Sequence, residues 1–419
     1  MREMKDSGVE WIGETPQNWK QSKVKYLMSL TNGRAYKQQE LLAKGTYRVL
    51  RVGNFNTNDK WYYSDLELPE KQYCEKGDLL YLWATTFGPA FWNEEKVIYH
   101  YHIWKVDQFR DYLQRYAFYT LSANAEWQRM QSHGSTMVHV TKEGVENTVF
   151  PVPPLSEQRR IVSYLDERCA AIDADIDKRH EVIEKLKEYR ESLIAHAVTK
   201  GLDPNTEMKD SGVEWFGKVP TTWEILRIGS LFQQKRVLID DATEDELLSV
   251  SEYYGVDYRK KHIKESDTLV RAESLRGYQQ CKRNDLIMNI MLAWKGAQAV
   301  SEYDGVISPS YGVFSPKGSI CPRYFHYLFR TNLYRTYFKS FSTGIMDSRL
   351  RLYPEVFLKL SAIVPPIADR ESIVAFLDER CAAIDGAISR QEQLIEKLGE
   401  YRKSIIHYAV TGKIDCTEA

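Results

Sequence analysis

An internal repeat constrains the fold of this 419-residue chain more than any other feature. Residues 4–13 (MKDSGVEWIG) return as residues 208–217 with nine of ten positions identical, 204 positions later. Residues 165–173 (LDERCAAID) return without change as residues 377–385, 212 positions later. A repeat of this length indicates two domain-sized copies and not a solenoid. The stretches between the matched segments show little resemblance, so we expect matched parts to build a shared frame and divergent parts to differ in role.

Each copy of LDERCAAID lies in a long segment with the apolar period of a helix that packs along one side. Apolar residues alternate steps of three and four, and both copies keep the same register. The residues expected in the helix–helix contact are Leu165, Cys169, Ile172, Ile176, Leu377, Cys381, Ile384 and Ile388. Ser156 and Asp369 are the expected N-caps, and Gly201 and Gly412 are expected to end the helices. About 44 residues would give a helix of about 65 Å.

The order of the repeated parts predicts a circular arrangement. The motif at Met208 follows the first helix, whereas its twin at Met4 precedes everything. If the halves are equivalent in space, residues near Met4 must lie beside the end of the second helix, near Thr411. We therefore expect antiparallel helices related by a pseudo-twofold axis, with the chain ends close together. We also expect side-by-side contact between residues 165–173 and 377–385.

Short β-branched and aromatic runs, such as residues 47–52 and 286–290, are typical of strands, and aromatic-rich residues 112–130 and 324–338 are typical of helices. The predicted fold class is α+β, with two globular domains, one for each variable block, joined by two long antiparallel coiled-coil-like helices. The predicted segments are a repeat motif (1–19), a first variable block (20–152), a first helix (153–201), a linker with the second motif (202–223), a second variable block (224–364) and a second helix with a tail (365–419).

The charge of the chain is unevenly distributed. The formal net charge is −1, but residues 20–146 contain 17 Lys and Arg against 14 Asp and Glu, a net charge of +3. Residues 224–359 contain 20 against 16, a net charge of +4. The bias is strongest from Lys20 to Arg51, where eight basic residues accompany one acid, Glu40. Because a local basic surface matters more to a polyanion than the chain average does, the composition is compatible with nucleic-acid binding.

Several loops of both blocks combine glycine with hydroxyl, amide or basic side chains. Such loops can offer hydrogen bonds to base edges or phosphates, and glycine permits close approach. The candidate DNA-contacting residues are Arg34, Lys37, Thr85, Thr86, Gly88, Ser135, Thr136, His139, Asn289, Lys295, Ser308, Tyr311, Thr343 and Arg349. For any one of them, a role in the core or in a turn is an equally good interpretation. Trp92 and Trp294 are expected to be buried supports.

No catalytic motif is evident in the sequence. It contains no P-loop, no GxGxxG, no HExxH and no Asp/Asn-Pro-Pro-aromatic tetrapeptide. Its six cysteines form no CxxC pair, which favours a reducing cytoplasm over a zinc ribbon or a disulfide framework. His100 and His102 would share one face of an expected strand, but no third ligand is evident. We therefore predict no catalytic residue, no metal site and no cofactor in this chain, and no membrane span.

The whole pattern resembles the specificity subunit of type I restriction-modification systems. The resemblance covers essentially the entire chain, although the second helix begins with PPIADRE in place of PPLSEQR. The residues that carry it are 5–13 with Pro16 and Trp19, residues 153–161 (PPLSEQRRI) and both copies of LDERCAAID; residues 289–313 also resemble one recurring class of target-recognition domain.

This resemblance implies that each variable block reads one half of an asymmetric, interrupted site in double-stranded DNA and that the helices set the gap. It implies two methylation subunits, which bring S-adenosylmethionine and flip an adenine for methylation. Motor-nuclease (restriction) subunits that use ATP and Mg would join for cleavage, in a bacterial or archaeal cytoplasm. The alternatives are a coiled-coil adaptor with two protein-binding domains and an enzyme with an unrecognised nuclease site.

Overall fold

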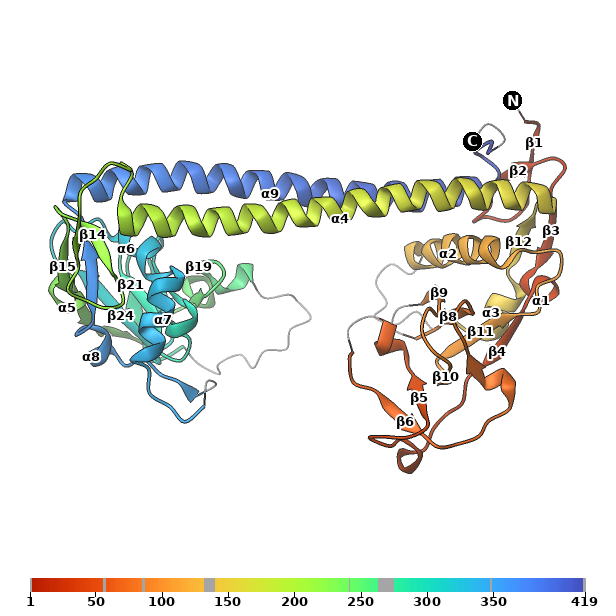
Figure 1. Ribbon diagram of the computed structural model, residues 1–419, viewed down its shortest axis with the longest axis horizontal. Helices are drawn as coiled ribbons and strands as arrows, with labels where there is room; N and C mark the ends of the chain where they lie inside the picture. Colours follow the sequence, from red (N-terminus) through yellow and green to blue (C-terminus); the bar gives the residue numbers. More distant parts are fainter. Residues whose placement is uncertain are drawn as a thin grey trace. The chain divides into compact units, whose positions relative to one another are not determined.

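A computed structural model describes residues 2–55, 58–84, 87–131, 140–240, 242–262, 275–346 and 349–416 (Figure 1). The chain forms two compact units. Unit 1 consists of Met1–His180 with Glu392–Ala419, and unit 2 consists of Glu181–Gln391. Each unit contains one variable block, one repeat motif and a part of each long helix. The predicted α+β class with paired long helices is confirmed.

Two long helices, α4 (Leu155–Lys200) and α9 (Ile367–Val410), have 46 and 44 residues. Their starts differ from the expected caps. The Pro154 carbonyl accepts from Gln158 N (3.0 Å), and the Pro366 carbonyl accepts from Arg370 N (3.1 Å). Helical hydrogen bonding therefore begins at the prolines, so Ser156 and Asp369 lie inside the first turn and the prediction that they are N-caps is wrong. The predicted ends are confirmed, because Gly201 and Gly412 follow the helices with φ of +86° and +82°.

The two long helices pack antiparallel within each unit. In unit 1, Leu165 and Cys169 of α4 share a hydrophobic cluster with Ala409 of α9, and Asp173 Oδ1 lies 2.9 Å from Arg402 Nε. In unit 2, Leu377 and Cys381 of α9 share a cluster with Ala197 and Val198 of α4, and Asp385 Oδ1 lies 3.2 Å from Arg190 Nε. The expected contact residues are buried to the same degree in both copies: Leu165 and Leu377 are 0% exposed, Cys169 and Cys381 4%, and Ile172 and Ile384 8%. Ile176 and Ile388 are half-buried.

The expected contact between the duplicated segments of these helices is also wrong. Residues 165–173 do not pack against their duplicate, residues 377–385, because the two segments belong to different units and different hydrophobic clusters. Antiparallel pairing of two equivalent helices brings the first part of each against the last part of the other. Contact between the two copies would require a parallel pair or a crossing at this segment.

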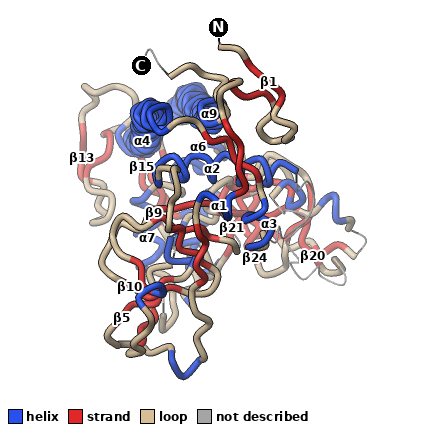
Figure 2. Tube along the Cα trace, turned by 90° about the vertical axis from the view of Figure 1, so that its right-hand side faces the viewer, coloured by secondary structure: helices blue, strands red, loops and turns tan. Residues whose placement is uncertain are grey.

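The repeat motifs form matching hairpins beside the helix ends. In unit 1, β1 (Met4–Asp6) pairs with β2 (Glu14–Pro16), and in unit 2, β13 (Met208–Asp210) pairs with β14 (Lys218–Pro220) in the same register. Lys413 Nζ, just after α9, donates to the Ile12 carbonyl (2.8 Å), and Lys200 Nζ, at the end of α4, donates to the Lys218 carbonyl. The predicted circular arrangement is confirmed, and β1 lies beside the end of α9 in Figure 2.

A tryptophan of each motif also contacts the first turn of a long helix. Trp19 Nε1 donates to Glu157 Oε2 (2.9 Å), and Trp223 Nε1 donates to Asp369 Oδ2 (3.3 Å). Glu157 and Asp369 occupy equivalent positions of α4 and α9. The departure of the second helix from the sequence of the first therefore preserves an acidic acceptor for the motif tryptophan.

The variable blocks share one sheet topology despite their different sequences. Both contain a four-stranded sheet in which all neighbouring strands are antiparallel. In unit 1 the order is β4 (Ser29–Asn32), β11 (Ile103–Asp107), β8 (Leu79–Leu82) and β9 (Gly88–Phe91). In unit 2 it is β16 (Phe232–Lys235), β24 (Tyr311–Pro316), β21 (Leu286–Asn289) and β22 (Gln298–Val300).

The remaining strands are arranged differently in the two blocks. Unit 1 has a second sheet of β6 (Tyr62–Ser64), β5 (Tyr47–Leu50), β10 (Val97–Tyr99) and β7 (Tyr73–Cys74). Unit 2 has β17 (Leu238–Ile239), β20 (Tyr278–Cys281) and β23 (Gly305–Ile307), with a separate hairpin of β18 (Leu248–Ser251) and β19 (Gly255–Tyr258). A two-stranded ribbon lies next to the start of each long helix: β3 (Lys20–Lys23) with β12 (Val149–Val152), and β15 (Glu224–Arg227) with β25 (Ser361–Val364).

Short helices complete each block. Unit 1 has α1 (Val24–Leu27), α2 (Gln114–Gln131) and α3 (Lys142–Asn147), and unit 2 has α5 (Ile228–Leu231), α6 (Pro322–Phe329), α7 (Asn332–Ser340) and α8 (Pro354–Phe357). The second aromatic-rich stretch is therefore two helices and not one. Thr331 causes the break, because it is the N-cap of α7 and its side chain accepts from Tyr334 N. No helix in the described part of the chain combines the length and apolar character that a membrane span requires.

Candidate nucleic-acid interface

Three connections of unit 1 lie together at one end of its four-stranded sheet: the segment after β4, the β8–β9 connection and the turn between β10 and β11. Trp83 N donates to the His102 carbonyl (3.2 Å), and Tyr101 N donates to the Arg34 carbonyl (3.0 Å). Arg34 N donates to the Tyr99 carbonyl (3.1 Å). These hydrogen bonds join the three connections into one surface.

The matching connections of unit 2 also lie together. Asn289, at the end of β21, is opposite Tyr311, at the start of β24. Leu352 N donates to the Ile290 carbonyl (2.9 Å), which places Leu352 beside the β21–β22 connection, and the neighbouring Arg351 pairs with Thr343 through backbone hydrogen bonds of 3.0 Å. Among the candidates of the second block, Asn289 and Tyr311 are paired across strands, Ser308 lies in the turn before Tyr311, and Thr343 pairs with Arg351; these hydrogen bonds do not join Lys295 or Arg349 to them.

The candidates differ in exposure. Lys37, Lys295, Thr343 and Arg349 are exposed, whereas Arg34, Ser308 and Tyr311 are half-buried. Asn289 is 4% exposed and its Oδ1 accepts from Met291 N (3.1 Å), so this side chain shapes the turn. Gly88 is buried with φ of +141°, and an added Cβ would lie 3.3 Å from Arg129 Nη2. Thr85, Thr86, Ser135, Thr136 and His139 lie outside the described residues.

Arg34 is held by neighbouring side chains. Its Nη2 lies 2.9 Å from Glu40 Oε1, and its guanidinium carbon lies 5.3 Å from the ring centre of Tyr36. The Lys37 backbone N–H and the Arg34 guanidinium together hold the pKa of Glu40 below its ordinary value. The one acid of the basic stretch from Lys20 to Arg51 therefore pairs with Arg34, while the side chain of Lys37 is exposed.

The turn of His100, Tyr101 and His102 belongs to this surface, although the sequence pattern had suggested a strand. β10 ends at Tyr99, so the prediction that both histidines lie in a strand is wrong. Their rings are 4.8 Å apart. Burial, followed by the nearby His102 and Arg51, lowers the pKa of His100 to about 4. A neutral imidazole offers one donor and one acceptor, which suits the reading of base edges. The sequence feature that could have indicated this part of the surface is the position of residues 100–102 between the strands β10 and β11.

The two tryptophans of the loops behave differently. Trp92 is 5% exposed and its Nε1 donates to the Glu95 carbonyl (2.8 Å), which confirms a supporting role. Trp294 is only half-buried, and the Nζ atoms of Lys295 and Lys339 lie 5.2 and 4.9 Å from its ring centre. The prediction that Trp294 is a buried support is therefore wrong, because the short β21–β22 connection leaves one face of its ring to two lysines.

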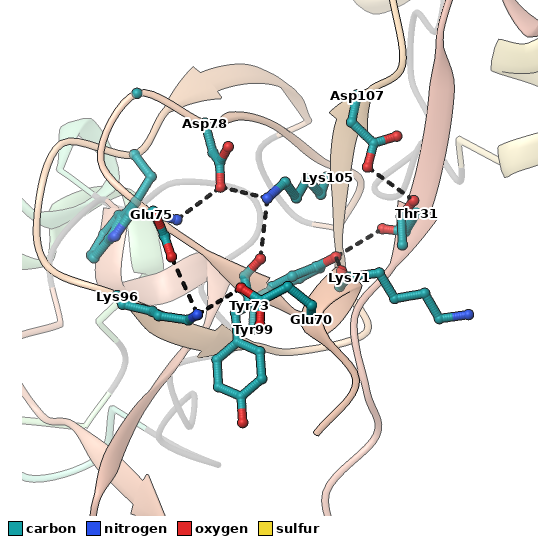
Figure 3. A network of polar contacts seen from close by, with 12 residues as sticks. Thr31, Glu70, Lys71, Tyr73, Glu75, Asp78, Lys96, Tyr99, Lys105 and Asp107 are labelled. Atoms are coloured by element: carbon teal, nitrogen blue, oxygen red, sulfur yellow. Dashed lines mark hydrogen bonds and ion pairs between the residues drawn. The ribbon is translucent and has the colours of Figure 1, made fainter. Parts of the chain in front are cut away.

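Carboxylates and lysines also gather between the two sheets of unit 1, as Figure 3 shows. Lys105 Nζ lies 2.7 Å from Asp78 Oδ2 and donates to the Tyr73 carbonyl (3.3 Å). Asp78 also accepts from Glu75 N (2.8 Å), and Tyr99 Oη donates to the Lys71 carbonyl (2.7 Å). Each of these contacts joins one strand or turn to another, so the network has a structural role. Among the described residues, no three His, Cys, Asp or Glu side chains form a group that could hold a metal ion.

Comparison with known proteins gives consistent results. Residues 16–185 match the family model of the type I restriction modification DNA specificity domain. The chain is 21% identical to the type I restriction enzyme EcoBI specificity subunit of Escherichia coli, over 99% of this chain and 90% of that protein. It is 23% identical to the type I restriction enzyme MjaVIII specificity subunit of Methanocaldococcus jannaschii, over 81% of this chain and 79% of that protein.

A solved structure shares the fold. It comes from work on complex assembly and conformational transition of the type I R-M system, and it has a TM-score of 0.67 at 14% identity. The similarity covers 96% of this chain and 99% of the other. The family match, the two relatives and the duplicated frame described above show that the chain is similar to type I restriction-modification specificity subunits.

Proposed function

We propose that this chain binds double-stranded DNA sequence-specifically, as the specificity subunit of a type I restriction-modification complex, and that each variable block reads one half of a bipartite asymmetric site. One observation carries this proposal: equivalent turns of one shared scaffold present different side chains. The turn between β10 and β11 carries His100, Tyr101 and His102, and the turn between β23 and β24 carries Ser308, Pro309 and Ser310. Different hydrogen-bonding groups at equivalent places of the scaffold suit two different half-sites.

The long helices suit the role of a spacer. A continuous helix of 46 residues is about 69 Å long. Half-sites on one face of DNA lie about 34 Å, one helical turn, apart. A frame of this length has room to support a reading domain toward each end. The helices would also dock two methylation subunits.

Catalysis would belong to the partners. We propose that methylation subunits bring S-adenosylmethionine and that restriction subunits bring ATP and Mg, while this chain supplies no catalytic residue and no cofactor. The two relatives, which are specificity subunits of type I restriction enzymes, support this division. The site of action would be the cytoplasm, where the DNA of a bacterium or archaeon lies.

Two measurements test the proposal. Methylation sequencing of cells that carry the complete system gives the modified motif, and fluorescence anisotropy then measures binding of that duplex to the chain with its methylation subunits. A reader that contacts 6–10 phosphates should lose about 10³–10⁵ in affinity between 50 and 200 mM salt. A coiled-coil adaptor would show neither a modified motif nor preference for it. Magnesium-dependent cutting by the purified chain alone would favour a nuclease instead.

A further inference from the structure

One carboxylate of each long helix holds the adjacent variable block. In unit 1, Asp166 Oδ1 of α4 accepts from Tyr119 Oη (2.5 Å) and Arg115 Nε (2.8 Å) of α2. In unit 2, Asp378 Oδ1 of α9 accepts from Tyr327 Oη and from Arg323 of α6, whose Nη2 lies at 3.1 Å. Asp166 and Asp378 are the same position of the duplicated LDERCAAID segment. The two blocks are therefore attached to equivalent points of the frame by the same chemistry.

A second contact attaches each block to the other helix of the pair. Tyr116 Oη of α2 donates to the Val410 carbonyl of α9 (3.0 Å), and Tyr324 Oη of α6 donates to the Val198 carbonyl of α4 (2.8 Å). Both tyrosines are 0% exposed. Buried hydroxyls need a partner, and here each finds one among the last carbonyls of a helix, which have no partner inside the helix itself.

The sequence of the joint is shared where the rest of each block diverges. Residues 115–119 read RYAFY and residues 323–327 read RYFHY, so both copies have the pattern Arg-Tyr-x-x-Tyr. On a helix, positions four apart lie on one face. The arginine and the second tyrosine consequently reach the same carboxylate, while the first tyrosine lies beside them and reaches the neighbouring helix.

Because each block touches both helices, two contacts restrict its movement. A single attachment would allow the block to roll about one helix, whereas contacts on α4 and α9 together resist rolling. The same contacts resist sliding of one helix along the other. We infer that Asp166 and Asp378, with their tyrosines, are positioning residues that set the orientation of each block toward its own half of the DNA site. This inference rests on the proposed function and adds which residues align each reading domain.

The test uses the chain with its methylation subunits and duplexes of the modified motif. Tyr119→Phe and Tyr327→Phe each remove one hydroxyl while keeping the buried ring. For each complex we would measure affinity for the intact motif, for duplexes with one base changed in either half-site, and for spacers one base pair longer or shorter. Each variant is a control for the other, because it removes the equivalent hydroxyl from the other unit. Tyr401→Phe and Tyr189→Phe, at equivalent exposed positions of α9 and α4, control for the loss of a tyrosine hydroxyl on the frame.

We expect Tyr119→Phe to weaken discrimination about tenfold at the half-site read by the first block and to leave the other half-site unchanged. Tyr327→Phe should do the reverse, and each should accept altered spacers more readily. Equal losses at both half-sites, or a lower melting temperature with unchanged discrimination, would overturn the inference. Asp166→Asn and Asp378→Asn should repeat the pattern. Failure of the unmodified complex to bind its motif would instead reject the proposed function.

Discussion

The circular closure of the chain can be measured through Gly412. Its φ of +82° costs a non-glycine residue about 1–2 kcal/mol. An added Cβ would also lie 2.3 Å from Cδ and 2.5 Å from Cγ of Pro16, in the N-terminal motif. Overpacking of this kind costs about 1–3 kcal/mol. Gly412→Ala should therefore lower the free energy of unfolding by about 2–5 kcal/mol.

Gly201 is the equivalent residue of the other half and provides a matched control. Its φ is +86°, but an added Cβ would first meet Trp223 Cζ2, at 3.4 Å, an ordinary contact distance. Gly201→Ala should accordingly lower the free energy of unfolding only by the cost of the positive φ, about 1–2 kcal/mol. The difference between the two variants isolates the contact between the first residues of the chain and the last turn of α9.

Urea unfolding, followed by tryptophan fluorescence and circular dichroism, gives both free energies by linear extrapolation. The urea dependence of the two variants should be the same, so that a change of midpoint reports a change of stability. If Gly412→Ala proved no more destabilising than Gly201→Ala, the N-terminal motif would not pack on the end of α9, and the reasoning for a closed circle would be refuted.

Three further outcomes are expected. Exchange of residues 224–364 for the block of another family member should change one half of the methylated motif and keep the other, as methylation sequencing would show; a change in both halves contradicts modular reading. Insertion of seven residues beside Arg179 in α4, read out the same way, should alter the spacer while both half-sites persist. Burial lowers the pKa of His100 and His407 to about 4, below the ordinary 6.5, so the unfolded chain binds protons first as the pH falls. The stabilisation by these neutral histidines is complete above about pH 6.5 and is lost toward pH 4. The urea midpoint of unfolding should therefore be lower at pH 5 than at pH 7. A smaller difference between the two midpoints in His407→Gln would confirm that this histidine contributes to the pH dependence.

The frame could be predicted from sequence because its evidence is periodic and duplicated. The heptad register gave the helices, and the positions of Met4 and Met208 gave the closed arrangement. It was harder to predict which segments of the two helices contact each other. Equal registers do not reveal which segments meet, so the copies of LDERCAAID were wrongly paired with each other. Arg190 and Arg402 interrupt the apolar pattern because each reaches an aspartate of the opposite helix, and that pairing depends on the antiparallel register.

The variable blocks were less predictable for a different physical reason. A sheet requires only that alternate or continuous positions be buried, so β8 (LLYL) and β21 (LIMN) form equivalent strands without similar sequences. The joint at Tyr119 and Tyr327 was missed because its copies are 208 positions apart, a spacing that differs from those of the motifs and helices. The histidine turn was misread because a strand boundary depends on tertiary hydrogen bonds, here those of Arg34 with Tyr99 and Tyr101.

The division of unit 1 between the two ends of the chain has a consequence for biosynthesis. All of unit 2 lies within residues 181–391, so its residues are all synthesised before residues 392–419. Unit 1 is made first but lacks the last turns of α9 until residues 392–419 emerge. Because nascent domains generally fold in the order in which they are completed, we expect unit 1 to be completed only after residues 392–419 are added, although its first block is synthesised first.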